Sequence, residues 1–270
     1  MDDRRTEMVD GPTGPLEVHV QGDGPAVLMI PSLGRGAVDF DRLAADVARA
    51  GYRALVPEPR GISRSNDVLT DMSMRDLADD VAAVIDACGG GPATVIGHAF
   101  GNRVARMVAT AHPDRVDGVI LLACGGLIPP SAEASAALLA VFDPTLPPDE
   151  HLAAVRTAFF APGNDPTVWV DGWHGDVAAA QGAATRSTPV EVWWAAGRAD
   201  VLVVQPTDDV IAAVANAEHI VALLDGRATM VVVPGAGHAL LPEQPELVSA
   251  AVVEWLDHRP GGRLMAEERR

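Results

Sequence analysis

The sequence predicts an α/β fold in which a mainly parallel sheet is wound with helices and interrupted once by an inserted helical cap. Short apolar runs alternate with helical patterns along most of the chain, as they do in parallel sheets. The alternation stops between residues 129 and 189, where an alanine-rich segment has prolines at its joints. A length of 270 residues suits one domain with such an insertion. We expect residues 1–128 and 190–270 to form the core and residues 129–189 to form the cap.

The strand predictions are short runs of β-branched and apolar residues, and the helix predictions are segments whose apolar residues recur every three or four positions. Ser73 and Asp76 have the spacing of a capping box, so we expect a helix to begin there. The predicted strands are residues 16–20, 26–30, 53–56, 94–96, 119–122, 190–194 and 230–233, and the predicted helices cover residues 40–50, 77–85, 103–111, 210–224 and 245–256.

The charge balance excludes several classes of function. The formal net charge is −17, and both nucleic acid and an anionic membrane surface require a basic face, so neither is an expected partner. All 20 basic residues are arginine, which removes lysine Schiff-base chemistry and a P-loop lysine. With 48% hydrophobic and 21% charged residues, the chain should fold as a globular enzyme whose partner is a small-molecule substrate. The sequence leaves a homodimer open.

The cysteine content and the N-terminus predict a soluble cytoplasmic protein. Cys88 and Cys124 are too few for a disulfide framework or a cysteine zinc site. Residues 1–7 lack the apolar core of a secretory signal, and no uncharged apolar run reaches the ~18 residues of a membrane span. Because the sequence contains no recognisable metal site, nucleotide loop or flavin motif, we expect no cofactor.

The strongest functional signal is the Gly-His-Ala-Phe-Gly turn at residues 97–101, which follows the strand at 94–96 and precedes the helix at 103–111. A strand that turns this sharply into a helix needs glycine at both outer positions, because no side chain fits there. The central residue, Ala99, is expected to be strained and to point upward at the N-terminus of the helix.

A second signal is the Pro-Gly-Ala-Gly-His run that ends at His238 and directly follows the strand at 230–233. The two motifs, in this order, resemble the α/β-hydrolase superfamily, in which the central elbow residue is the nucleophile and a loop after a late strand carries the catalytic histidine. The resemblance covers residues 16–258. It implies that Ala99 occupies the nucleophile position and that His238 is the catalytic histidine.

The resemblance also implies an acid just after the strand that precedes the histidine strand, and two interpretations compete. If residues 190–194 form that strand, the following Gly-Arg-Ala-Asp turn supplies Asp200, which matches the Gly-x-x-Asp turn common in the family. If residues 201–204 form it, Asp209 or Asp208 takes the role, and the 29 residues from Asp209 to the histidine suffice for one helix and one strand. We favour Asp200 because of its motif.

The loop Pro-Ser-Leu-Gly-Arg-Gly at residues 31–36 stands where related hydrolases carry His-Gly followed by a donor to the oxyanion hole. That alignment implies that the backbone N–H of Leu33 is one donor and that of Phe100 is the other. The Glu-Pro-Arg-Gly-Ile-Ser turn at residues 58–63 resembles the Asp-x-Arg-Gly-x-Gly turn of the same family and is expected to be structural.

Ala99 has no atom that can attack a carbonyl carbon, so the acyl-enzyme mechanism is closed to this chain. Three hypotheses account for the alanine. The first is a serine hydrolase whose nucleophile was replaced by design. The second is a natural enzyme, either a hydrolase or a cofactor-free lyase, isomerase or cyclase, that uses the Asp200–His238 pair as a general base. The third is a ligand-binding protein that has kept the fold.

The substrate pocket should lie above the elbow and under the cap. Aromatic side chains in the cap would favour a small apolar or aromatic substrate of the carbonyl or ester type, and a cap histidine could add a polar contact. The same aromatic side chains could instead anchor the cap to the sheet. The candidate pocket residues are Phe159, Phe160, Trp169, Trp173 and His174.

Overall fold

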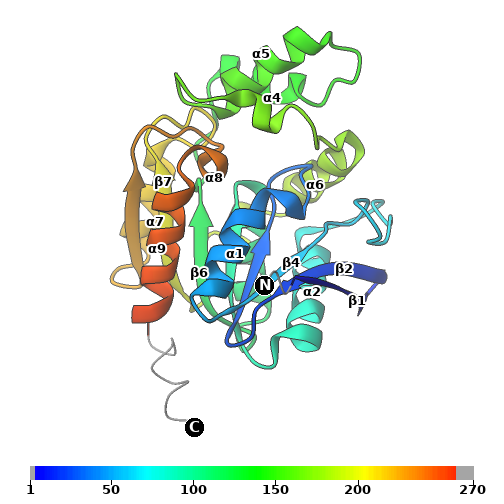
Figure 1. Cartoon of the computed structure of the whole chain (residues 1–270), viewed down its shortest axis with the longest axis vertical. Helices are drawn as coiled ribbons and strands as arrows, with labels where there is room; N and C mark the ends of the chain where they lie inside the picture. The colour runs from blue at the N-terminus through cyan, green and yellow to red at the C-terminus, as the bar shows by residue number, and fades with distance from the viewer. Residues whose placement is uncertain (1–3, 260–270) are drawn as a thin grey trace.

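An eight-stranded sheet runs through the centre of the molecule (Figure 1). The computed structural model describes residues 4–259, and its strands are β1 (Arg5–Gly11), β2 (Gly14–Gln21), β3 (Ala26–Ile30), β4 (Arg53–Pro57), β5 (Ala93–His98), β6 (Val116–Leu122), β7 (Asp200–Pro206) and β8 (Ala228–Val233). The spatial order is β1-β2-β4-β3-β5-β6-β7-β8. Strands β1 and β2 pair antiparallel, as do β2 and β4, and all the other pairs are parallel. The predicted mainly parallel α/β sheet is confirmed.

Six of the predicted strands coincide with β2, β3, β4, β5, β6 and β8, but the strand predicted at residues 190–194 is wrong. Val190–Val192 is a short 3-10 helix, and the two tryptophans that follow it pack against the guanidinium of Arg106 at 4.7 and 4.4 Å. The partner of β6 is β7, which begins only at Asp200. The strand predictions also omitted β1, a largely exposed strand at the edge of the sheet.

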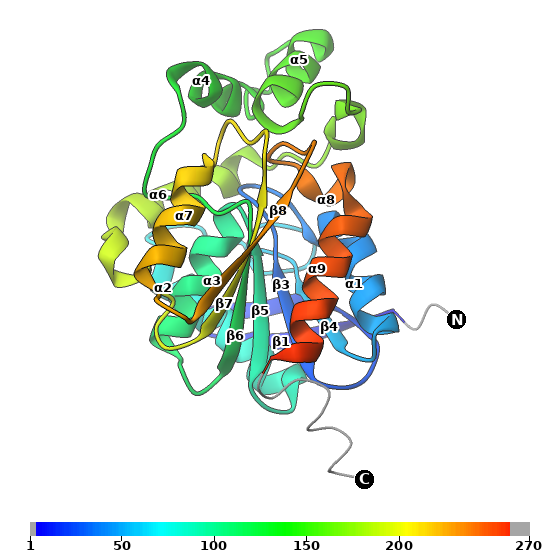
Figure 2. The same cartoon turned by 90° about the vertical axis from the view of Figure 1, so that its left-hand side faces the viewer.

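Helices cover both faces of the sheet (Figure 2). Helices α1 (Asp41–Arg49) and α9 (Pro245–His258) pack on one face, and α2 (Met74–Val84), α3 (Phe100–Ala111) and α7 (Val214–Leu223) pack on the other. The predicted capping box is present at the start of α2, where the side chains of Ser73 and Asp76 each accept a hydrogen bond from the other residue's backbone N–H. The predicted helices are confirmed, except that α7 begins at Val214 rather than at residue 210.

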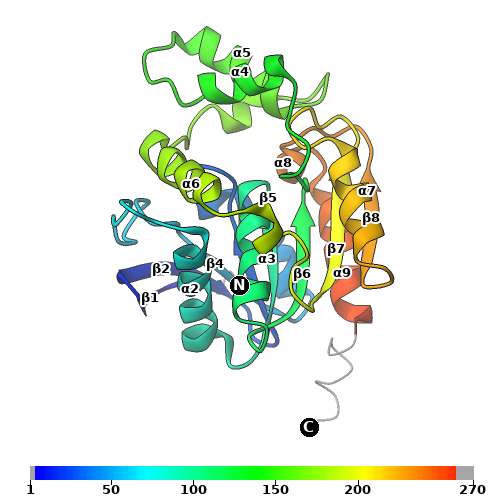
Figure 3. The same ribbon diagram turned by 180° about the vertical axis from the view of Figure 1, so that it is seen from behind.

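The chain between β6 and β7, residues 123–199, is largely helical and includes the predicted cap at residues 129–189; it is called the helical segment below. It contains α4 (Ala132–Ala140), α5 (Pro148–Phe159) and α6 (Gly175–Ser187). Figures 1 and 3 show α4 and α5 above the edge at which the parallel strands end, with α6 below them and above α2. The segment thus covers the edge of the sheet from which the functional loops emerge. None of the helices within residues 4–259 combines the length and the apolar character needed to cross a bilayer.

Candidate active site

The elbow at Ala99 has the strained geometry that the sequence predicts. Between the end of β5 and the start of α3, Ala99 takes φ 52° and ψ −106°. A Cβ atom at Gly97 would lie 2.2 Å from the backbone of Gly101, and a Cβ atom at Gly101 would lie 2.1 Å from the carbonyl oxygen of Ile30. Because no Cβ atom tolerates such contacts with backbone, only glycine fits at these two positions. Such strain is usually retained at functional sites.

His238 and Asp209 form a buried, hydrogen-bonded pair. His238 lies in the loop between β8 and α8 (Leu240–Glu243), and Asp209 lies in the loop between β7 and α7. Oδ2 of Asp209 is 2.8 Å from Nδ1 of His238, and the two side chains are 0% and 5% exposed. The other carboxylate oxygen accepts the backbone N–H groups of Ile211 and Ala212 at 2.8 and 2.7 Å. An ionised carboxylate only accepts hydrogen bonds, so it holds the proton on Nδ1 and leaves Nε2 free to act as a base.

The preference for Asp200 as the acid is wrong, because Asp200 does not lie near His238. Asp200 is the first residue of β7 and is exposed at the amino end of that strand, whereas His238 follows the carboxyl end of β8. The Gly-x-x-Asp turn therefore lies before a strand rather than after it. Asp208 is exposed and accepts a hydrogen bond from Thr207. The spacing argument for Asp209, rather than the motif, identified the residue that contacts the histidine.

His98, which was not among the predicted site residues, supports the loop that carries His238. Its side chain is fully buried, and Nε2 lies 2.7 Å from the backbone carbonyl oxygen of His238. Burial, with a smaller contribution from the neighbouring His238, lowers the pKa of His98 to about 3. The ring is therefore neutral and donates its Nε2–H to that carbonyl. Its position directly before Ala99 was the available signal, because a residue next to the elbow necessarily lies near the site.

A cavity of about 350 Å³ lies above the elbow. Its lining brings together Ala99, His238 and the two predicted oxyanion donors, Leu33 and Phe100, with Ser32 beside them. Phe100 is the first residue of α3, where a backbone N–H has no carbonyl partner within its own helix. The cavity therefore combines a base with backbone donors, on elements that are far apart in the sequence.

Among the predicted aromatic pocket residues, only Phe159 belongs to the lining of the cavity within the described part of the chain. Trp169 is buried against the ring of His98, with centroids 5.8 Å apart, and Phe160 packs against Trp169. Trp173 packs against Phe159 at 4.9 Å. His174 is the N-cap residue of α6, and no contact with the cavity is found for it. The expectation that Trp169, Trp173, Phe160 and His174 line the pocket is therefore wrong for this cavity. Trp169 packs on the core, whereas Phe160 and Trp173 pack on other aromatic side chains of the helical segment.

Arg35 joins the loop after β3 to the helical segment. Its guanidinium packs against two indole rings, 4.5 Å from the centroid of Trp169 and 4.4 Å from that of Trp173. Its Nε and one terminal nitrogen donate hydrogen bonds of 2.9 and 2.6 Å to the carboxylate of Asp39. The other terminal nitrogen donates a hydrogen bond of 2.7 Å to the backbone carbonyl of Asp171. This buried cation holds the loop of Leu33 against the segment above it.

Glu243 makes a second connection between the helical segment and the core. Its carboxylate accepts the backbone N–H of Gly237 at 2.8 Å, next to the candidate catalytic histidine. It also accepts the backbone N–H of Ala161 at 2.7 Å and the side-chain amide of Asn164 at 2.6 Å. Burial raises the pKa of Glu243. One carboxylate therefore positions the histidine loop and the end of the segment together.

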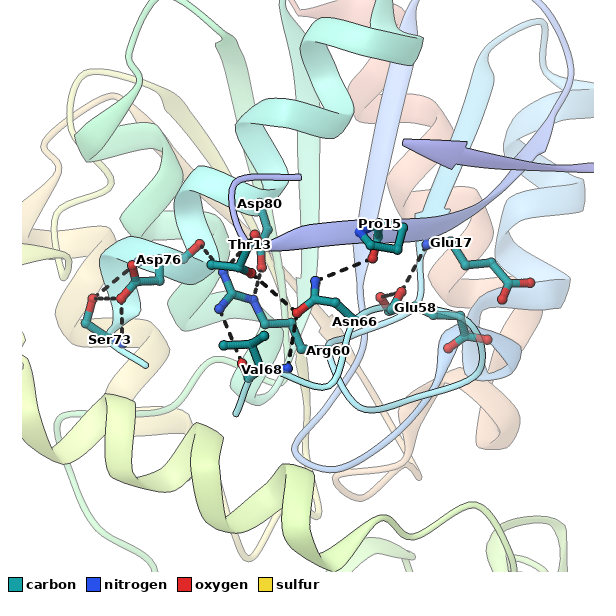
Figure 4. Close-up of polar contacts among 11 residues, drawn as sticks. Thr13, Pro15, Glu17, Glu58, Arg60, Asn66, Val68, Ser73, Asp76 and Asp80 are labelled. Carbon is teal, nitrogen blue, oxygen red and sulfur yellow. Dashed lines mark hydrogen bonds and ion pairs between the residues drawn. The ribbon is translucent and has the colours of Figure 1, made fainter. Parts of the chain in front are cut away.

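The contacts of the turn at residues 58–63 are those of a structural element. Figure 4 shows Arg60 directed at Asp80 of α2, to which it donates hydrogen bonds of 2.5 and 2.8 Å. Burial raises the pKa of Asp80 despite this partner. Glu58 accepts the backbone N–H of Ala37, which fixes the turn to the chain that follows the loop of Leu33. The turn therefore stiffens the side of the site without entering the cavity.

These features define the class of the protein. A strained elbow between a central parallel strand and a helix, followed in sequence by a buried acid and histidine, is the arrangement of α/β-hydrolases. The family described as alpha/beta hydrolase fold matches residues 25–147, and the family described as TAP-like protein matches residues 169–260. The chain belongs to the α/β-hydrolase superfamily.

Two relatives of the chain are hydrolases. A 2-hydroxy-6-oxo-6-phenylhexa-2,4-dienoate hydrolase of Burkholderia cepacia is 34% identical over 117 residues, which are 42% of this chain and 41% of that protein. Epoxide hydrolase B of Mycobacterium tuberculosis is 33% identical over 99 residues, which are 36% of this chain and 28% of that protein. The chain thus matches less than half the length of these relatives.

Two solved structures show the likeness of the fold over nearly the whole chain. The thermophilic esterase from Thermogutta terrifontis has a TM-score of 0.75 and 25% identity, and the match covers 94% of this chain and 98% of that one. The esterase from Exiguobacterium antarcticum has a TM-score of 0.79 and 17% identity, with coverage of 93% and 99%.

Proposed function

We propose that the chain is a hydrolase that acts on a small carbonyl or ester-type substrate by general-base catalysis. In this proposal the Asp209–His238 pair activates a water molecule, which replaces the serine hydroxyl that Ala99 lacks. The observation that carries the proposal is the 2.8 Å contact between Oδ2 of Asp209 and Nδ1 of His238 beside a cavity that Ala99 also lines. The hydrolase relatives support the reaction class.

The proposed steps need no covalent enzyme intermediate. Nε2 of His238 accepts a proton from water as the water oxygen bonds to the carbonyl carbon of the substrate. The backbone N–H groups of Leu33 and Phe100 donate to the carbonyl oxygen as it becomes negative. When the tetrahedral intermediate collapses, the leaving group takes the proton back from the imidazolium, and the acid is released. Asp209 orients the imidazole and stabilises its positive charge.

The test measures release of p-nitrophenol from p-nitrophenyl acetate and p-nitrophenyl butyrate. The parent protein should hydrolyse at least one ester faster than His238→Ala and Asp209→Asn do, by about a hundredfold or more. The matched control is Asp208→Asn, because Asp208 is exposed and directly precedes the acid; this variant should keep the parent rate. A parent rate equal to that of His238→Ala on both esters would contradict the proposal.

Ala99→Ser distinguishes general-base catalysis from a serine hydrolase with a replaced nucleophile and from a ligand-binding protein. General-base catalysis predicts turnover by the parent protein without an initial burst and without an acyl adduct in its intact mass, and Ala99→Ser should add both. If Ala99→Ser turns over and the parent protein does not, the cavity is that of a serine hydrolase with its nucleophile replaced. If neither turns over, the fold serves ligand binding.

A further inference from the structure

Almost all the arginines of the described chain are paired. Within residues 4–259, the guanidinium forms no hydrogen bond or ion pair with another residue only in Arg103, Arg156 and Arg186. Arg156 is exposed on α5. Arg186 is exposed as well and Arg103 is partly buried, but both of them line the cavity above Ala99. The unpaired positive charge of this part of the protein is therefore concentrated in the candidate active site.

The two arginines reach the cavity from separate elements. Arg103 lies on α3 four residues after Ala99, so its Cα is about 6 Å further along the helix axis. Arg103 thus lies in the first turn of the helix, and its side chain belongs to the lining of the cavity together with Ala99. Arg186 lies in the last turn of α6, next to Thr185, which lines the cavity as well. The helical segment and the core thus each contribute one cation.

The remaining lining does not neutralise these cations. Within the described chain, no aspartate or glutamate belongs to the lining of this cavity, although the whole protein carries a net charge of −17. Most other lining residues are apolar or small, among them Leu127, Leu138 and Ile211. Burial lowers the pKa of Arg103, yet a guanidinium stays protonated at neutral pH. A partly desolvated cation without a counter-ion is unfavourable unless a ligand brings the anion.

We propose that the cavity binds small molecules that carry a carboxylate. Arg103 pairs with this carboxylate through its guanidinium fork, and Arg186 contacts the same carboxylate from the helical segment. The inference rests on the proposed function, because it names the substrate class of the same cavity. A planar carboxylate matches the two parallel N–H donors of a guanidinium. The apolar lining would take the rest of the molecule and leave its reacting carbonyl beside His238.

The test compares an acid with its neutral isostere, 3-phenylpropanoate with 3-phenylpropanamide, by isothermal titration calorimetry on the full chain. The acid should bind at least about tenfold more tightly than the amide. Arg103→Gln should abolish this preference, and Arg186→Gln should reduce it. Arg156→Gln removes an unpaired arginine outside the cavity and should retain the parent preference. Thermal melting of each variant establishes that it is folded.

Three results would overturn the proposal: equal binding of acid and amide, no binding of either at millimolar concentration, or an unchanged preference in Arg103→Gln. Titration with inorganic phosphate supplies a further arm, because phosphate that binds more tightly than the acid would replace carboxylate as the recognised group. Binding is read without turnover, so the two proposals fail separately. If ester hydrolysis depends on His238 and the acid is not preferred, only the anion site fails. If the acid is preferred and no ester is hydrolysed, only the hydrolase proposal fails.

Discussion

Acidification from pH 7 to pH 5 should destabilise this protein by an amount that can be assigned to His98. Burial lowers the pKa of His98 from 6.5 to about 3 in the folded protein. In the unfolded chain the pKa returns to its ordinary value. At any pH between 6.5 and about 3, the unfolded state therefore binds one more proton than the folded state. The stability that depends on the neutral ring is complete above pH 6.5 and falls by about 1.4 kcal/mol for each pH unit below it. From pH 7 to pH 5 the loss is about 2 kcal/mol.

Urea unfolding at pH 7 and pH 5 measures this loss in the parent protein, in His98→Gln and in a control, His258→Gln. Glutamine keeps a donor for the carbonyl of His238 and removes the titrating ring. His258 is exposed, and within the described residues the hydrogen bond of its ring is with the carbonyl of Glu254 in its own helix. We expect His98→Gln to lose about 2 kcal/mol less than the parent on acidification, while His258→Gln follows the parent. The same pH dependence in the parent and in His98→Gln would refute the reasoning.

Two further substitutions test the packing of the site. Gly101→Ala should destabilise the protein by more than about 3 kcal/mol or prevent folding, because the new Cβ would lie 2.1 Å from the carbonyl oxygen of Ile30. Gly175→Ala, at the start of α6 with its nearest atom 3.5 Å away, is the control and should be neutral or slightly stabilising in urea unfolding; equal stability of the two variants would contradict the argument. Asp39→Asn should lower the free energy of unfolding by about 3 kcal/mol, because Arg35 would stay buried without its anion. An unchanged melting temperature would show that the ion pair does not stabilise the fold.

The elbow and the histidine could be predicted from the sequence because their requirements are local. The two glycines of the elbow are imposed by contacts within a few residues, and the run that ends at His238 follows directly on a strand. The acid could not be chosen in this way. Residues 190–194 and 200–206 both have the composition of a strand, and pairing with β6, a long-range contact, selects the second. That selection moves the end of the strand to Pro206 and brings Asp209, not Asp200, to the histidine.

The lining of the cavity was also beyond the sequence. Aromatic composition predicted a pocket lined by the tryptophans of the helical segment, but Trp169 packs against His98 and Arg35 instead of lining the cavity. The walls of the cavity come instead from loops of small residues and from side chains such as Arg103. That Arg103 has no anionic partner in the described part of the chain can be recognised only from the three-dimensional contacts of the other charged residues. Local patterns therefore located the site but did not describe its interior.

The contacts around Arg35 link the helical segment above the cavity to the backbone of Leu33, the proposed oxyanion donor. Arg35 lies two residues after Leu33 and is held by Asp39 on the core side and by Trp169 and Trp173 on the other. Any displacement of the helical segment large enough to widen the cavity would pull on this guanidinium and hence on the backbone of Leu33. In the proposed mechanism, a molecule that forces the cavity open would therefore encounter a misdirected N–H, so the proposed substrates would be selected by size at the chemical step as well as at entry.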